Sequence, residues 1–192
     1  MIIKINIQQT YLSFFYLVGN FFYSLFYFCF ILILLALGFG LTICWVGIPL
    51  VIFLFQIIEK IINKDMKFAE NLLPIEYNKI KFKKYPEENL LGKFKLYITN
   101  KKIWRYIGFY LLRFPITVAT FSISIFLVLV PVVLIIAPLI YNFVSYNILL
   151  FEVNSLFSAL LLSVLGLGLS FIFFPILNNV ALKQGALLKK ID

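Results

Sequence analysis

The chain has 192 residues, of which 63% are hydrophobic and 13% are charged, and its mean hydropathy is +1.03. Soluble domains are about 45–50% apolar and about 25% charged, so the composition excludes an ordinary soluble protein. Histidine is absent and there are only two cysteines, which leaves almost nothing for a zinc or haem site, so we expect no metal and no cofactor.

No charged side chain occurs in residues 5–58, a run of 54 residues. Because a helix needs about 20 apolar residues to cross the hydrocarbon core, this run can cross, turn and cross back. It predicts spans over residues 14–37 and 41–62, with a turn near Gly38 and Gly40. The run is far longer than the core of a signal peptide, and we expect no cleavable one.

The two cysteines, Cys29 and Cys44, both lie in this apolar run. A tight hairpin could join them in a disulfide. Free, buried cysteines that behave as small hydrophobic residues are the favoured interpretation.

A charged segment follows at about residues 63–110. Apolar residues recur at helical spacing over residues 57–73, with charges on the other face, so the second span is predicted to continue as an amphipathic helix that Pro74 ends. Residues 79–83 and 93–98 alternate like strands. Lysines that snorkel beside interfacial aromatic side chains give the same pattern, and this interpretation is favoured.

Thr99 and Asn100 form a plausible cap for a helix that leads into the next span. The aromatic residues and arginines at its start are typical membrane anchors at headgroup depth. A sharper hypothesis pairs Glu59, at the exit of the second span, with Arg105 or Arg113. The residues assigned to this juxtamembrane interface are Glu59, Trp104, Arg105, Tyr110, Arg113 and Pro115.

A second apolar block runs from residue 109 to about residue 182, and a polar stretch at residues 141–155 interrupts it. The only charge in that stretch is Glu152. The block therefore predicts a third span over residues 111–140, a short loop, and a fourth span over residues 155–182.

Charge orients the four predicted spans. Residues 59–113 hold 13 of the 17 lysines and arginines, whereas the two loops on the other side hold none. By the positive-inside rule, both termini and the central segment face the cytoplasm, and residues 1–192 form a single all-α multi-pass domain of the cytoplasmic membrane. We interpret the net charge of +9 as this topology signal together with attraction to anionic lipid headgroups, and not as nucleic-acid binding.

Residues 37–42 (LGFGLT) recur as residues 165–170 (LGLGLS), and a proline follows each copy. With two spans in each half, the copies would mark parallel repeats related by an axis along the membrane normal. Ordinary helix packing within one chain explains the same glycines. The residues assigned to helix packing are Gly38, Gly40, Gly47, Pro49, Gly166, Gly168 and Pro175.

The motifs of the chain follow a recognisable order. They are Gly47-Ile48-Pro49 in the second span, Glu59-Lys60 at its exit, Leu72-Leu73, Trp104-Arg105, Tyr110-Leu111-Leu112-Arg113 with Pro115, and Leu187-Leu188. This order resembles the four-helix membrane sensor domain found ahead of histidine kinases in actinobacteria and archaea. In that family a kinase domain often follows the last span, whereas this sequence ends at Asp192. The resemblance therefore implies a stand-alone sensor with a separate output protein.

We expect a membrane sensor or regulatory module that passes a signal through its cytoplasmic juxtamembrane segment to a separate protein or through a homo-oligomer. A small oligomeric channel or transporter is the alternative, although the span interiors offer only neutral polar residues such as Asn20 and Thr117. A structural subunit of a membrane complex is a third possibility. An enzyme is not expected, because the sequence offers no catalytic constellation.

Overall fold

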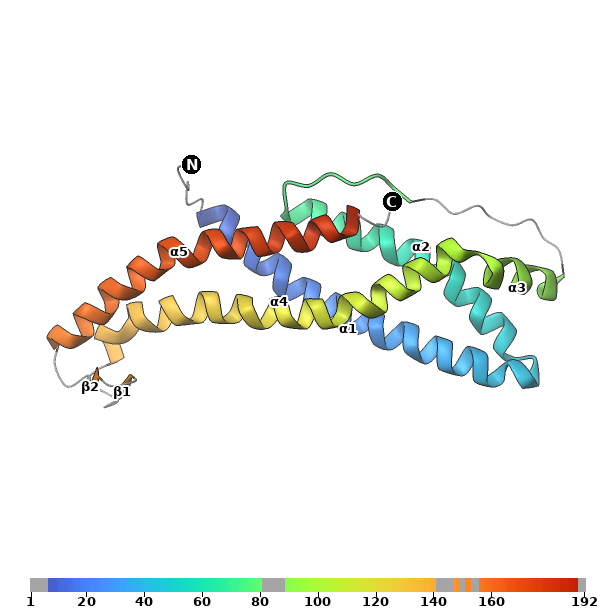
Figure 1. Ribbon diagram of the computed structural model, residues 1–192, viewed down its shortest axis with the longest axis horizontal. Helices are drawn as coiled ribbons and strands as arrows, with labels where there is room; N and C mark the ends of the chain where they lie inside the picture. Colours follow the sequence, from blue (N-terminus) through green and yellow to red (C-terminus); the bar gives the residue numbers. More distant parts are fainter. Residues whose placement is uncertain (1–6, 81–88, 141–146, 149–150, 153–155, 190–192) are drawn as a thin grey trace.

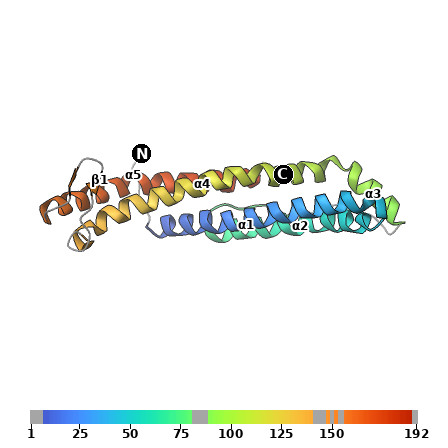
Figure 2. The same cartoon turned by 90° about the horizontal axis from the view of Figure 1, so that it is seen from below.

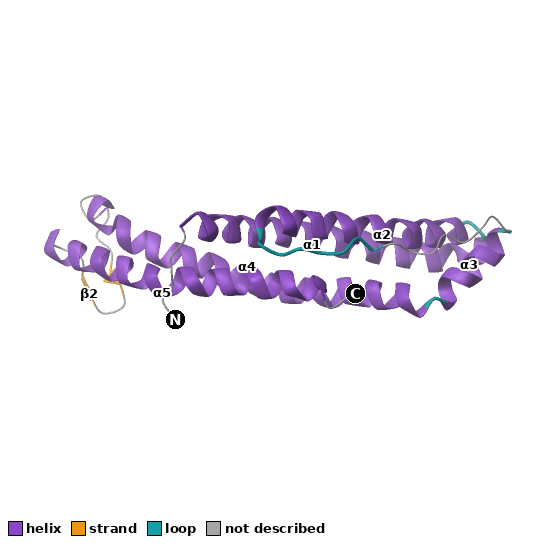
Figure 3. Cartoon of the chain, turned by 90° about the horizontal axis from the view of Figure 1, so that it is seen from above, coloured by secondary structure: helices purple, strands orange, loops and turns teal. Residues whose placement is uncertain are grey.

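The computed structural model describes residues 7–80, 89–140, 147–148, 151–152 and 156–189 (Figure 1). Nearly all of them are helical (Figure 3). The elements, in chain order, are α1 (Ile7–Gly40), a 3₁₀ helix η1 (Leu41–Cys44), α2 (Gly47–Leu72), α3 (Leu90–Thr99), α4 (Lys101–Ile140), the strands β1 (Asn147–Ile148) and β2 (Phe151–Glu152), and α5 (Leu156–Lys189). The two short strands pair antiparallel in the connection between α4 and α5.

Three helices are long and apolar enough to cross a membrane: α1 over Gln8–Gly40, α4 over Lys101–Leu139 and α5 over Leu156–Lys189. The prediction of an all-helical membrane protein is thus confirmed. Among the described residues, α2 does not qualify, because charges begin at Glu59 and leave only its first 12 residues uncharged. An apolar stretch of about 10–14 residues is more typical of a buried or interfacial helix, so the second predicted span, over residues 41–62, and with it the count of four spans, is not confirmed.

Two helical hairpins, α1–α2 and α4–α5, lie against each other as two layers (Figures 1 and 2). The ring contacts between α1 and α4 occur in reverse order along the chain: Phe21 on Phe121, Phe28 on Phe114 and Phe39 on Trp104. The two helices are therefore antiparallel, and the first hairpin turn lies at the same end of the molecule as α3 (Figure 1). The predicted four-span topology requires the first and third spans to run in the same direction, so this packing differs from it.

The first turn lies beyond its predicted position at Gly38 and Gly40. The helix α1 continues through both glycines, and the chain reverses in residues 41–46. Trp45 takes the left-handed conformation there, with a φ of 64°. At Gly47 an added Cβ would collide with the backbone at the end of α1, so this position needs glycine for α1 and α2 to meet directly after the reversal.

The other glycines assigned to helix packing divide into two groups. A Cβ added at Gly38 would lie 2.6 Å from a methyl group of Val51, and one added at Gly166 would lie 2.8 Å from Cβ of Leu134. For a Cβ added at Gly40 or Gly168, no neighbouring atom of the described residues lies within 4 Å. Only the first group lies at close contacts between helices.

The two copies of the predicted repeat occupy different places. Residues 37–42 end α1 and enter the turn, and Pro49 stands in the first turn of α2, where its missing N–H leaves no hydrogen bond unmade. Residues 165–170 lie in the middle of α5, and Pro175 lies further inside the same helix. The copies have no equivalent surroundings, so the architecture does not support a parallel repeat.

The juxtamembrane predictions have mixed outcomes. The amphipathic helix predicted over residues 57–73 is confirmed as the second half of α2, which ends just before Pro74. Residues 93–98 lie in α3, so their alternation does not make a strand, because leucine and lysine are good helix formers. Asn100 caps α4 as predicted, since its side-chain Oδ1 accepts the N–H of Lys102 at 3.0 Å.

Cys29 has a free thiol, as predicted, but it faces outward from α1, so the prediction of burial is wrong for this residue. The side chain of Cys44 lies outside the described residues. Residues 81–83 of the first lysine-rich stretch and most of the predicted loop at 141–155 lie outside them as well.

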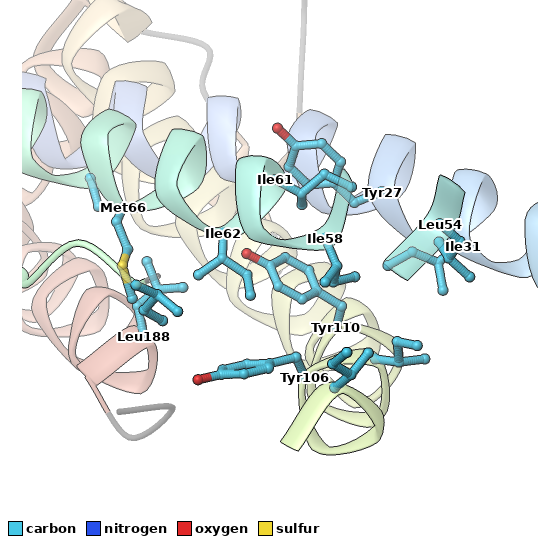
Figure 4. Close-up of a cluster of buried hydrophobic side chains, with 14 of the residues drawn as sticks. Tyr27, Ile31, Leu54, Ile58, Ile61, Ile62, Met66, Tyr106, Tyr110 and Leu188 are labelled. Atoms are coloured by element: carbon cyan, nitrogen blue, oxygen red, sulfur yellow. The ribbon is translucent and has the colours of Figure 1, made fainter. Parts of the chain in front are cut away.

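The buried core lies where α1, α2 and α4 meet (Figure 4). Aliphatic side chains of α2 fill its centre, tyrosines of α1 and α4 line it, and the last turn of α5 reaches one side. The members that Figure 4 labels are Tyr27, Ile31, Leu54, Ile58, Ile61, Ile62, Met66, Tyr106, Tyr110 and Leu188. Many large apolar side chains elsewhere on α1, α4 and α5 are exposed, as expected for helices that contact lipid.

The pair Gly166 and Gly168 provides a matched test of the packing between α4 and α5. We expect Gly166→Ala to lower the free energy of unfolding by about 1–3 kcal/mol, because the added methyl group would meet backbone atoms of α4 at 3.0 Å. Gly168→Ala should be neutral or stabilise by up to about 1 kcal/mol through helix propensity. Denaturation in detergent measures both, and equal effects of the two substitutions would contradict this packing.

Candidate functional site

Arg113 of α4 is buried inside the protein, with 2% of its surface exposed. The sequence places it at the membrane interface as an anchor. In the structure one terminal nitrogen of its guanidinium forms an ion pair with Oδ2 of Asp65 on α2, which is equally buried. A charge buried in this way is stable only when it has a partner and hydrogen bonds, so the residues around the pair determine whether it forms.

A third helix and a neighbouring tyrosine contribute to the ion pair. The other terminal nitrogen of Arg113 donates to Oδ1 of Asn20 on α1 at 2.7 Å. The Tyr110 hydroxyl donates to Oδ2 of Asp65 at 3.0 Å, and the Arg113 guanidinium lies 5.8 Å from the centre of the Tyr110 ring. Hydrogen bonds to charged groups are stronger than those between neutral groups, so α1, α2 and α4 are tied at one point.

The helix α5 joins the same cluster through Thr117. The Thr117 hydroxyl donates to the carbonyl oxygen of Arg113 at 2.9 Å and accepts from the side-chain amide of Gln184 at 3.0 Å. Both side chains are buried. We call Asn20, Asp65, Tyr110, Arg113, Thr117 and Gln184 the polar cluster, and it connects all four long helices.

The segment after α2 forms a second connection to α5. The Tyr77 hydroxyl donates to the carbonyl oxygen of Gly185 at 2.9 Å, and a Cβ at Gly185 would lie 2.7 Å from Ile75. Asn63 of α2 holds the same segment through two hydrogen bonds with the backbone of Ile80, of 2.8 and 2.9 Å. Burial raises the pKa of Tyr77 to about 12, so the hydroxyl is a protonated donor at neutral pH.

The predicted interface residues are only partly brought together. Tyr110 and Arg113 belong to the polar cluster, whereas the exposed Arg105 lies over the ring of Tyr106. The carboxylate beside Arg113 is that of Asp65, and a contact between Glu59 and Arg105 stays a prediction.

Trp104 fixes the start of α4 against the first hairpin. Its indole N–H donates to the carbonyl oxygen of Ile98 in α3 at 2.8 Å, and its ring contacts those of Phe39 and Phe55. Pro115 lies inside α4, two residues after Arg113.

The sequence analysis missed Asp65 as a site residue because it assigned all the charged residues near the end of α2 to the solvent-exposed face of that helix. A signal was present, since Asp65 stands three and four residues from the apolar positions Ile62, Ile61 and Ala69, on the buried face. Gln184 gave no signal of its own, because a single polar residue near a helix end is most often at a surface.

Comparison with protein families relates this geometry to known proteins. The family described as "Putative sensor" matches residues 16–191, which include every member of the polar cluster. The chain belongs to this sensor family. This match confirms the resemblance to a membrane sensor domain that the order of its motifs indicated. Comparisons with curated proteins and with solved structures gave no match. Within the described residues, no three candidate metal ligands come together.

The ion pair of the sensor can be tested by a double-mutant cycle. We expect Asp65→Leu and Arg113→Leu each to cost about 3–5 kcal/mol of unfolding free energy, because each leaves a buried charge without its partner. The double variant should lose much less than the sum of the two.

The matched control is Glu76→Gln, which removes an exposed carboxylate in the segment after α2. This change should alter the free energy of unfolding by less than about 0.5 kcal/mol. Thermal unfolding of the purified protein measures all four variants. Additive losses in the cycle would contradict a direct pairing of Asp65 with Arg113.

Proposed function

We propose that this chain is a membrane sensor that passes a signal to a separate signalling protein through the segment between α2 and α4. The observation that carries the proposal is the polar cluster, in which Asp65 and Arg113 connect α1, α2 and α4, and the hydrogen bond between Thr117 and Gln184 adds α5. A stimulus that moves one of these helices within the bilayer must break these hydrogen bonds or carry the neighbouring helices along. Such a stimulus acts by binding unequally to two arrangements of the helices.

Two contacts connect the polar cluster with the surface away from the bilayer. Trp104, about two and a half turns before Arg113 on α4, is hydrogen-bonded to α3. Tyr77 links the segment after α2 to the last turns of α5. A shift of α4 or α5 would therefore change the position of α3 and of residues 73–80, and this region is the proposed output surface.

Basic side chains at the α3–α4 corner support a second partner, the anionic lipid headgroups. Lys95, Lys101, Lys102 and Arg105 are exposed there, and exposed Leu90 and Leu91 lie at the start of α3. Each basic residue near an anionic membrane surface contributes about 1 kcal/mol to binding, so this corner is expected to lie on the cytoplasmic leaflet.

We also propose that the sensor catalyses no reaction. General acid–base catalysis needs a group that is free to exchange a proton with a substrate. The buried carboxylate of Asp65 is instead engaged with Arg113 and Tyr110, and the sequence contains no histidine.

For the topology we propose four crossings in the cytoplasmic membrane, with both termini in the cytoplasm. This is supported by the absence of charge from residue 5 to residue 58 and by the concentration of basic residues in residues 59–113. One observation favours three crossings instead, with the N-terminus outside. The helix α1 packs antiparallel to α4, which two helices entering from the same side would not do.

The signalling proposal can be tested by cross-linking in the native cell. A photo-reactive amino acid at the exposed Lys102 should capture a specific partner protein, whereas one at the exposed Leu161, on the far half of α5, should capture only lipid or background. Asp65→Asn should change the yield at Lys102 by about fivefold or more, the usual scale of coupling between sites. No protein captured at Lys102 above the level at Leu161 would contradict the proposal.

The topology is tested by reporter fusions at both ends. A reporter active only in the cytoplasm should work at the C-terminus in either topology, which provides the control. Activity at the N-terminus is expected for four crossings, and its absence, with activity of an externally active reporter, would establish three.

A further inference from the structure

Residues 73–80 form an extended strap after α2 that passes the end of α5 (Figures 1 and 3). Within the described part of the chain, residues 75–80 belong to neither helix nor strand. The strap runs back along α2, because it leaves the helix after Leu72 and its residue Ile80 is bonded to Asn63, about two and a half turns earlier on α2. It is therefore a separate piece of chain that lies against two helices.

Side chains take part in most of the hydrogen bonds that hold the strap. The N–H of Tyr77 donates to Oε1 of Glu70 at 2.9 Å. The side-chain amide of Asn63 bonds both the N–H and the carbonyl oxygen of Ile80. The Tyr77 hydroxyl donates to the carbonyl oxygen of Gly185. A segment held in this way opens locally at a lower free energy than the helices, whose backbone groups bond to one another.

The strap also touches the backbone of α5. A Cβ added at Gly185 would lie 2.7 Å from Ile75 and 2.9 Å from Leu73, so no side chain separates the strap from the helix at this point. Close packing of this kind does not tolerate displacement. A shift of α5 toward the strap would produce a collision, and a shift away from it would break the hydrogen bond from the Tyr77 hydroxyl.

The strap and the polar cluster use neighbouring residues of the same two helices. On α5, Gln184 belongs to the cluster, and the next residue, Gly185, accepts the hydrogen bond from Tyr77. On α2, Asp65 belongs to the cluster, and Asn63, two residues earlier, holds the strap. Because residues within one turn of a helix move together, neither helix can shift at the cluster without moving a partner of the strap.

We propose that the strap is a latch that stays closed only while the polar cluster is intact. The hydrogen bond between Gln184 and Thr117 fixes the end of α5 to α4. Loss of this bond frees α5 to move, and the carbonyl oxygen of Gly185 then leaves the Tyr77 hydroxyl. The strap opens as one segment, whereas the helices stay folded. A change between order and disorder in one segment is a common form of molecular switch.

The role of this latch in signalling rests on the proposed function, in which residues 73–80 are part of the output surface. The coupling of the strap to the cluster is a property of the chain alone and is measured without a partner. Failure of the coupling would leave the cross-linking result at Lys102 unaffected, and failure to capture a partner there would leave the latch intact. The two proposals can therefore fail separately.

Hydrogen–deuterium exchange of the purified full chain measures the latch, through a peptide that covers residues 74–80. Thr117→Val removes the hydroxyl that bonds Gln184 and leaves every hydrogen-bond partner of the strap in place. It should speed the exchange of this peptide by about tenfold, a usual scale of coupling between sites. Thr120→Val is the matched control, because among the described residues that hydroxyl donates only to carbonyl oxygens of α4. It should leave the exchange unchanged.

Exchange in the second half of α2 and in the last turns of α5 separates the latch from a general loss of stability. Equal acceleration of these helices and of the strap by Thr117→Val would mean that the whole bundle has loosened, and it would overturn the proposal. Tyr77→Phe removes the bond between the strap and α5 directly and should speed the exchange of residues 74–80. Acceleration by Tyr77→Phe but not by Thr117→Val would show that the strap opens independently of the cluster, and it would also overturn the proposal.

A second variant breaks the same bond from its other end and keeps the test decisive should Thr117→Val not fold. Gln184→Met removes the donor and keeps a side chain of similar length. It should speed the exchange of residues 74–80 as much as Thr117→Val does. The double variant should be no faster than either single variant, because both act through one bond. Multiplied effects in the double variant would contradict this route from the cluster to the strap.

Discussion

The buried ion pair of Asp65 and Arg113 is the constraint on which the rest of the structure depends. Neither charge can remain in an apolar interior alone, because transferring an unpaired ion out of water is far more costly than any single contact repays. Each charge therefore needs partners, and besides each other these are Asn20 on α1 and Tyr110 on α4. Thr117, which donates to the backbone carbonyl of Arg113, and Gln184, which donates to Thr117, add α5 to the cluster. The helices must therefore pack so that Asp65, Arg113 and their partners lie next to one another.

This requirement explains why the polar cluster is a good place to couple the helices. Apolar side chains in lipid can slide past one another with little penalty, since lipid tails are as apolar as leucine. Hydrogen bonds to a buried charge are directional and cannot be exchanged with lipid. A displacement of α1, α2 or α4 by one turn would leave Arg113 or Asp65 without partners, and a displacement of α5 would break the bond between Gln184 and Thr117. Motions of the four helices are therefore coupled through the polar cluster.

The length of α4 relates the cluster to the bilayer. Its 40 residues extend about 60 Å, roughly twice the thickness of a hydrocarbon core. The longer part of α4, after Arg113, is uncharged and exposes large apolar side chains such as Leu129 and Leu139, whereas the shorter part before it exposes Lys101, Lys102 and Arg105. Arg113 therefore stands at the change from one environment to the other, where a rearrangement in the bilayer can be passed to α3.

The sequence by itself determined the membrane class, the amphipathic end of α2, the Asn100 cap and the family, because each depends on composition or on neighbours within one turn of helix. It could not determine the position of the first turn, which depends on the close approach at Gly47, or the different surroundings of the two glycine-rich segments. Only the tertiary structure decided that Asp65, and not Glu59, contacts Arg113 and that Asn20 and Gln184 complete the cluster. The reason is physical. The side chains that bond a buried charge lie far apart in the sequence, whereas periodicity shows only which face of its own helix a residue occupies and not which helix packs against that face.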